Sequence, residues 1–176
     1  MDSMDKAEQA FKLGLEYEKR FRGCAQGAVA AIQDALDVKD ACVYKCASGL
    51  SAGGGQCTDG SCGAYVGGVM MMSLLFGRAR EDEPTEKGTE DKHASTRLAA
   101  ELHDRFIAKY GSVRCQDIHE KIFGRRFELR SSDGKDAFEA AGAHTDDDKC
   151  GAVVGAASRW TVELIQNESA RRERSR

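Results

Sequence analysis

Apolar residues recur at helical spacing along most of the chain. In the first segment, one stripe is formed by Ala7, Phe11, Gly14, Tyr17 and Phe21, and most of the remaining positions are charged or polar. A spacing of three and four residues is typical of an amphipathic helix with one buried face. The pattern therefore predicts that the protein begins with an amphipathic helix.

The same periodicity predicts further helices along the chain. They are expected over residues 24–36, 40–50, about 61–77, 93–110, 113–123 and 151–168. In the helix over residues 93–110, Leu98, Leu102, Phe106 and Ile107 are expected to face inward. Only residues 125–130 alternate with a period of two, and this segment is too short to change an all-α assignment.

Three segments lack a sustained apolar pattern. Residues 78–92 are highly charged and hold the only proline, so we expect an exposed loop there. Residues 124–148 are expected to be irregular, with one helical turn near Phe138, and residues 171–176 to form a disordered basic tail. The predicted fold is one compact helical domain over residues 1–170, a bundle of about six to seven helices.

Composition supports this prediction and excludes several classes of protein. The chain has 176 residues, of which 31% are charged and 7% aromatic, so Ala, Leu, Val and Met must fill the core. A net charge of −3 gives no reason to expect a nucleic-acid partner. The longest apolar run, residues 64–76, is shorter than the roughly 20 residues that a membrane span requires. Because residues 1–12 lack an apolar signal region, we expect a cytoplasmic protein without a membrane partner.

Cysteine and glycine recur together at the predicted helix starts. Cys24, Cys62 and Cys150 each adjoin two glycines spaced four apart, namely Gly23 and Gly27, Gly63 and Gly67, and Gly151 and Gly155. The positive end of a helix lowers the pKa of a thiol placed there, which favours metal binding or redox chemistry. A glycine stripe allows the close approach of another helix or of a compact inorganic cluster. Gly-rich close crossings are therefore expected within the bundle.

The cysteines allow more than one interpretation. All seven are expected to be free of structural disulfides, because the cytoplasm keeps thiols reduced. By spacing alone, a compact set of Cys42, Cys46, Cys57 and Cys62 could bind a metal. Burial in helix packing is the simplest explanation for Cys42 and Cys46. Cys115 and His119 are four residues apart and could share one helix face, but His119 is left outside the main predicted site.

Four stretches resemble a known family. They are "GCAQG" at 23–27, "ASGLSAGGGQCTDGSCGAYVGGVMM" at 47–71, "YGSVRCQDIHEKIFGRRFEL" at 110–129 and "KCGAVVGAASRW" at 149–160. Their order and spacing are similar to those of the C_GCAxxG_C_C family of redox-active proteins, which is related to the cysteine domain of split-Soret cytochromes. The resemblance implies a small helical redox protein whose four cysteines correspond to Cys24, Cys62, Cys115 and Cys150.

The resemblance also indicates a cofactor. It implies that the four dispersed cysteines converge on one site and hold an iron–sulfur cluster, for which four thiolates are a suitable ligand set. The chain contains no C-x-x-C-H motif, so covalently bound haem is not expected. Cys42, Cys46 and Cys57 are additional to the family pattern, and the resemblance favours the dispersed set over the compact one.

These observations lead to one main hypothesis and two alternatives. The main hypothesis is a non-enzymatic electron-transfer protein that exchanges electrons with a redox partner protein, with a homodimer left open. The first alternative uses the same cysteines as a dithiol–disulfide couple without a cofactor. The second is a structural zinc-binding or scaffolding helical module, for which a closed tetrahedral cysteine site would be needed.

Overall fold

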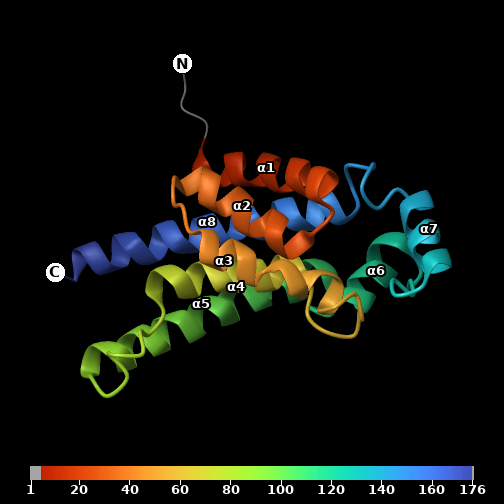
Figure 1. Ribbon diagram of the computed structural model, residues 1–176. Coiled ribbons are helices and arrows are strands. Elements are labelled where there is room, and N and C mark those ends of the chain that lie inside the picture. Colours follow the sequence, from red (N-terminus) through yellow and green to blue (C-terminus); the bar gives the residue numbers. More distant parts are fainter. Residues whose placement is uncertain (1–4, 176) are drawn as a thin grey trace.

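The fold is all-α, as the sequence predicts. The computed structural model describes residues 5–175, so residues 1–4 of the predicted domain and residue 176 of the predicted tail lie outside it. Within the described residues there are eight α-helices, one 3-10 helix and no strand (Figure 1). They are α1 (Lys6–Phe21), α2 (Cys24–Leu36), α3 (Ala41–Cys46), η1 (Ser48–Gly53), α4 (Gly63–Phe76), α5 (Glu86–Tyr110), α6 (Cys115–Phe123), α7 (Ser132–Ala140) and α8 (Cys150–Arg174).

The long helix α8 organises the bundle. It packs against α1, α2 and α4, and α5 lies along α4 on the side away from α1 (Figure 1). The short helices α6 and α7 lie together at one end of the molecule. The main core between the long helices is aliphatic with few rings, and it includes the fully buried side chains of Val29, Ile32, Met71, Leu102 and Phe106.

Glycines permit close helix crossings at several of the predicted positions. A Cβ atom on Gly67 of α4 would lie 2.7 Å from the carbonyl oxygen of Ala25 on α2. A Cβ on Gly155 of α8 would lie 2.7 Å from the carbonyl oxygen of Phe11 on α1. Around Gly23, by contrast, the nearest atom would be at an ordinary contact distance of 3.6 Å, so this glycine does not mark a close crossing.

Helix α5 begins earlier than the sequence predicts. Residues 86–92, expected in the exposed loop, form its first two turns. Thr85 caps this start, because its hydroxyl accepts a hydrogen bond of 3.0 Å from the N–H of Gly88. Further along, Leu98 and Phe106 are buried as expected, but Ile107 is 41% exposed, so it does not face inward as predicted.

The segment 124–148 is more ordered than the sequence predicts. It contains α7, whose start is capped by the hydroxyl of Ser131, and this helix brings the number of helices above the predicted six to seven. A second small core forms here from Phe127, Leu129, Phe138 and Ala143. We call residues 124–148 the cap, because they cover the end of the bundle where the cysteines meet.

Most of the predicted disordered tail is helical in the structure. Helix α8 continues to Arg174, which places residues 171–174 in its last turn. Glu168 stabilises this turn by accepting hydrogen bonds from Nε of Arg171 at 2.8 Å and from Nε of Arg172 at 3.0 Å. These charge pairs extend the helix beyond the point where its apolar pattern stops.

Candidate redox site

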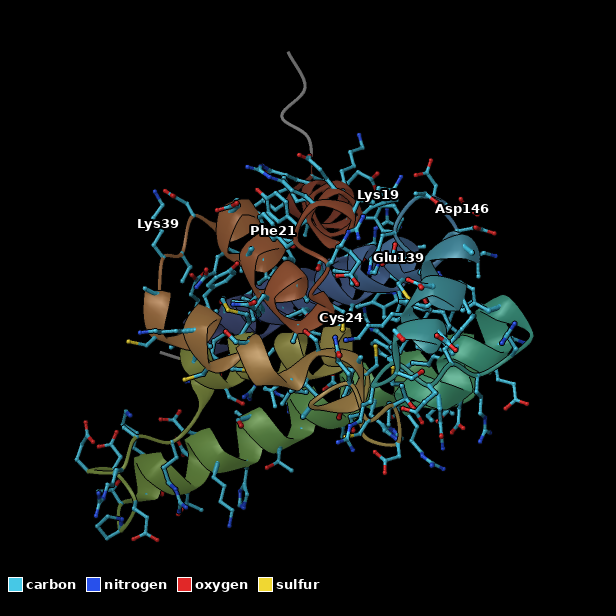
Figure 2. The ribbon with its side chains drawn as sticks, turned by 45° about the vertical axis from the view of Figure 1, so that its right-hand side comes forward. Lys19, Phe21, Cys24, Lys39, Glu139 and Asp146 are labelled. Carbon is cyan, nitrogen blue, oxygen red and sulfur yellow. The ribbon has the colours of Figure 1, made fainter. Side chains whose placement is uncertain are left out.

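Four cysteines that lie far apart in the sequence line one cavity of about 410 Å³. Cys24, Cys115 and Cys150 are the first residues of α2, α6 and α8, and Cys62 is the residue that precedes α4. Figure 2 labels Cys24 and Glu139, which belong to the bundle and cap sides of this cavity. The structure therefore brings together the four cysteines of the dispersed set, each at a helix N-terminus.

Backbone pairing brings Cys62 and Cys115 together. The N–H of Cys62 donates to the carbonyl of Val113 at 2.7 Å, and the N–H of Cys115 donates to the carbonyl of Gly60 at 2.9 Å. Ser61 and Arg114 form an isolated antiparallel bridge between these bonds. The segment before α4 is thus aligned with the segment before α6, and both helices begin at the cavity.

The sulfur of Cys24 lies between η1 and the first residue of α4. A Cβ atom on Gly63 would lie 2.5 Å from Sγ of Cys24, so only glycine leaves room for the sulfur at this point. On its other side, the N–H of Ala52 lies 3.5 Å from the same sulfur and points a donor at it. Gly63, although it is next to Cys62 in the sequence, therefore leaves room for the sulfur of Cys24.

Cys150 reaches the cavity because the start of α8 is tied to α6 and packs against the cap. Nζ of Lys149 donates a hydrogen bond of 3.1 Å to the carbonyl of Ile122 at the end of α6. Cys150 also packs against the small core of the cap. The first turn of α8 is thereby held against α6.

Burial decides the protonation of the four thiols. It raises the pKa of Cys62 to about 11, although the N–H groups of Ala64 and Tyr65 lower it in part. Burial raises the pKa of Cys24 and Cys150 further, and the negative charge of Glu18 adds to the effect at both. The pKa of Cys115 is raised in the same way, first by burial and then by its neighbouring cysteines. Without a bound metal, all four are neutral thiols at pH 7.

An acidic and histidine-containing wall faces the thiols, and the sequence analysis did not identify it. Glu18 of α1 is 3% exposed, lines the cavity and has one oxygen, Oε2, without a hydrogen-bond partner. His144 lies between this carboxylate and Glu139, with Nε2 3.6 Å from Oε1 of Glu18 and Nδ1 2.7 Å from Oε1 of Glu139. Burial alone would lower the pKa of His144, but the two carboxylates outweigh it and hold the pKa above its ordinary value.

His119 also belongs to the site, although the sequence analysis placed it outside. It lines the cavity, and its Nε2 lies 3.5 Å from Sγ of Cys115. Burial lowers the pKa of His119 to about 4, so the ring is neutral at pH 7. Its spacing of four residues from Cys115 was the sequence signal that pointed to this contact.

The compact set of cysteines is not brought together. Cys42, Cys46 and Cys57 are exposed and do not line the cavity, whereas Cys62 is buried beside Cys115. All seven cysteines are unpaired. Within residues 5–175, no three histidine, cysteine or acidic side chains are placed around one common metal-ion position.

The dispersed cysteines coincide with a family pattern. The C_GCAxxG_C_C family, described as "Putative redox-active protein", matches residues 23–164. This range starts just before Cys24 and includes α8 beyond Cys150. The chain belongs to the C_GCAxxG_C_C family. As a member of this family it is a redox-active protein, and its four cavity cysteines all lie within the matched range.

Other comparisons add no relatives to this family assignment. Neither a curated protein nor a solved structure matches the chain. The chemistry of this C_GCAxxG_C_C protein must therefore be argued from its own cavity.

Proposed function

We propose that the protein is an electron-transfer protein in which Cys24, Cys62, Cys115 and Cys150 hold an iron–sulfur cluster. The observation that supports this most strongly is the convergence of four cysteine-bearing helix starts on one cavity of about 410 Å³. Such a cluster, when bound, supplies reversible one-electron chemistry. The fold's own contribution is to bring four cysteines that are far apart in the sequence to one cavity.

The donor set and its surroundings fit an iron–sulfur cluster. Four soft thiols are the ligands that such clusters take, and metal binding deprotonates a thiol despite its raised pKa. The helix N-termini direct partial positive charge at the sulfurs, which offsets the negative charge of bound thiolates. The cavity is also much larger than a single zinc ion with sulfur ligands at about 2.3 Å would fill.

The state of the thiols argues against free dithiol chemistry. A thiolate is the form that attacks a disulfide, and burial keeps all four cavity cysteines protonated. The acidic Glu18 opposes a thiolate at Cys24 and Cys150 in particular. A bound metal removes this obstacle, because it replaces the proton on each sulfur.

The test is to measure the cofactor in anaerobically purified protein. We expect iron, acid-labile sulfide and visible absorption in the parent, and we expect all three to be lost in Cys24→Ala and Cys150→Ala. The matched control is the double variant Cys42→Ala/Cys46→Ala, which should keep them because both side chains are exposed and outside the cavity.

Each other outcome identifies a different function. Loss of iron only in the double variant would move the site to Cys42, Cys46, Cys57 and Cys62. Stoichiometric zinc without colour would indicate a structural module. A colourless, metal-free protein whose cavity cysteines form a reversible disulfide would establish the dithiol alternative.

The redox partner, the cellular location and the oligomeric state of the protein stay predictions. None of the described helices combines the length and the apolar character needed to cross a membrane. An electron-transfer protein requires a redox partner, and we propose that this partner is another protein. The cytoplasmic location and a homodimer are not tested by the structure.

A further inference from the structure

His119 is placed to act on one of the four cavity cysteines. It lies one helical turn after Cys115 on α6, so both side chains project from the same face of the helix. The two residues are each 4% exposed, and Nε2 of His119 lies 3.5 Å from Sγ of Cys115. This distance is within the range of a hydrogen bond to sulfur.

Aromatic residues at the end of α6 and in the cap hold the imidazole in this orientation. The ring centroid of His119 lies 5.0 Å from that of Phe138, 5.7 Å from that of Phe123 and 5.8 Å from that of Phe127. None of these rings offers a conventional hydrogen-bond acceptor that could compete for the imidazole. The other nitrogen, Nδ1, is buried and has no hydrogen-bond partner. Among the described residues, the sulfur of Cys115 is therefore the one polar partner of this ring.

The direction of the hydrogen bond follows from the chemistry of a ligand thiolate. A neutral imidazole carries a single N–H, on one nitrogen or the other. A thiolate that binds iron has no proton to donate, so the contact with Cys115 is favourable only if Nε2 carries the hydrogen. The ring then donates Nε2–H to Sγ and leaves Nδ1 as an unprotonated nitrogen.

We infer that His119 is a positioning residue that donates a hydrogen bond to Cys115 and thereby raises the reduction potential of the centre. This inference rests on the proposed function. A hydrogen bond to a ligand sulfur stabilises the more negatively charged, reduced state more than the oxidised one, and such bonds are among the factors that set cluster potentials. Within residues 5–175, Cys115 is the one cavity cysteine with an imidazole at hydrogen-bond distance, so the effect is directed at one ligand of the four.

The experiment compares two substitutions of His119 in the anaerobically purified full chain. His119→Phe fills the aromatic cage but removes the N–H, and His119→Gln restores an amide N–H near the position of Nε2. His103→Gln is the control, because His103 is 43% exposed and does not line the cavity. The readouts are iron and sulfide per chain and the midpoint potential from a spectroelectrochemical titration.

We expect His119→Phe to lower the midpoint potential with iron content unchanged, and His119→Gln to recover most of the shift. The inference is overturned if His119→Phe keeps its iron and the parent's potential. It is also overturned if both substitutions lose iron while His103→Gln keeps it, since His119 would then be a ligand. If only His119→Phe loses iron, a potential in His119→Gln near that of the parent supports the inference, and a lowered potential contradicts it. Absence of iron and sulfide from the parent would overturn the proposed function, and the inference would fall with it.

Discussion

At the scale of single residues, two opposing effects act on the cavity cysteines. A helix N-terminus favours a thiolate by about 0.3–1 kcal/mol, less than one pKa unit. Burial acts in the other direction and can shift a pKa by several units. Burial dominates here, as the raised pKa of about 11 at Cys62 shows. The helix starts thus provide a place for ligand sulfur without producing a free reactive thiolate.

This balance predicts which thiols react in the metal-free protein. At pH 8, iodoacetamide should modify the exposed Cys42, Cys46 and Cys57 first, and the four cavity cysteines, which are partly or fully buried, much more slowly. A pKa of about 11 instead of 9 leaves Cys62 with roughly 100-fold less thiolate, before any steric protection is counted. Peptide mass spectrometry over time measures the order of modification. Rapid modification of Cys24 or Cys150 in the folded protein would contradict the burial argument and favour dithiol chemistry.

At the scale of elements, the crossing of α2 and α4 brings Cys24 and Cys62 to the same cavity. Both helices begin at the cavity, and their first turns lie side by side. This arrangement requires small residues on the facing sides of the two helices. Gly63 leaves room for the sulfur of Cys24, and Gly67, one turn later, leaves room for the backbone of α2.

Gly67→Ala should therefore destabilise the fold. The added Cβ would lie 2.7 Å from the carbonyl oxygen of Ala25, a backbone atom that can move only with its helix. We expect the free energy of unfolding to fall by about 1–3 kcal/mol, the usual cost of overpacking. Urea unfolding measures this change. Gly49→Ala is the control, since a Cβ at Gly49 meets nothing within 4 Å, and an equal loss in both variants would show that the crossing is not strained.

At the scale of the whole molecule, α8 connects two chemically different ends. It begins at Cys150 in the thiol cavity, and Glu168 lies 18 residues further along, about 27 Å away at 1.5 Å per residue. Glu168 is buried to 1% side-chain exposure and accepts hydrogen bonds from Arg171, Arg172 and Arg97, the last of which belongs to α5. One end of the bundle therefore forms the candidate redox site, and ion pairs link α5 to α8 at the other.

Glu168→Gln should make stability depend less on pH. The hydrogen bond from Arg171 and the other two arginines lower the pKa of Glu168 from 4.5 to about 2, so the charged carboxylate stabilises the folded state. This contribution is complete above pH 4.5 and is lost as the pH falls through 2. At pH 7 we expect a loss of roughly 1–3 kcal/mol, and near pH 2 the variant should approach the parent.

The control for this prediction is Glu101→Gln. Glu101 also pairs with Arg97, at 2.6 Å, but is 44% exposed, so its removal should cost no more than about 1 kcal/mol. Thermal unfolding across this pH range measures both variants. A difference between Glu168→Gln and the parent that persists undiminished near pH 2 would contradict the ion-pair explanation. Neither variant should change the iron content, because both residues lie away from the cavity.

Much of the helical framework could be predicted from the sequence, because helix formation depends on local patterns. Helices α2, α6 and α8, which bear Cys24, Cys115 and Cys150, lie close to the ranges that apolar periodicity predicts, and α2 and α8 begin within one residue of them. The family resemblance indicated that these cysteines act with Cys62, and its pattern does match residues 23–164. Whether the four hold a cofactor stays a prediction.

The sequence by itself determined the all-α class and most helix positions, because periodicity is a property of neighbouring residues, and its resemblance to the C_GCAxxG_C_C family indicated the four cysteines. Only the tertiary structure decided that Glu18 is buried, that His144 pairs with it, and that the cap encloses His119. Glu18 is a charged residue on the same face of α1 as the buried Ala7, Ala10 and Gly14. Its burial depends on α2, α8 and the cap. The last two of these lie more than 100 residues further along the chain. Local periodicity cannot predict such contacts, because a segment's own pattern shows which face is buried but not which distant residues lie against it.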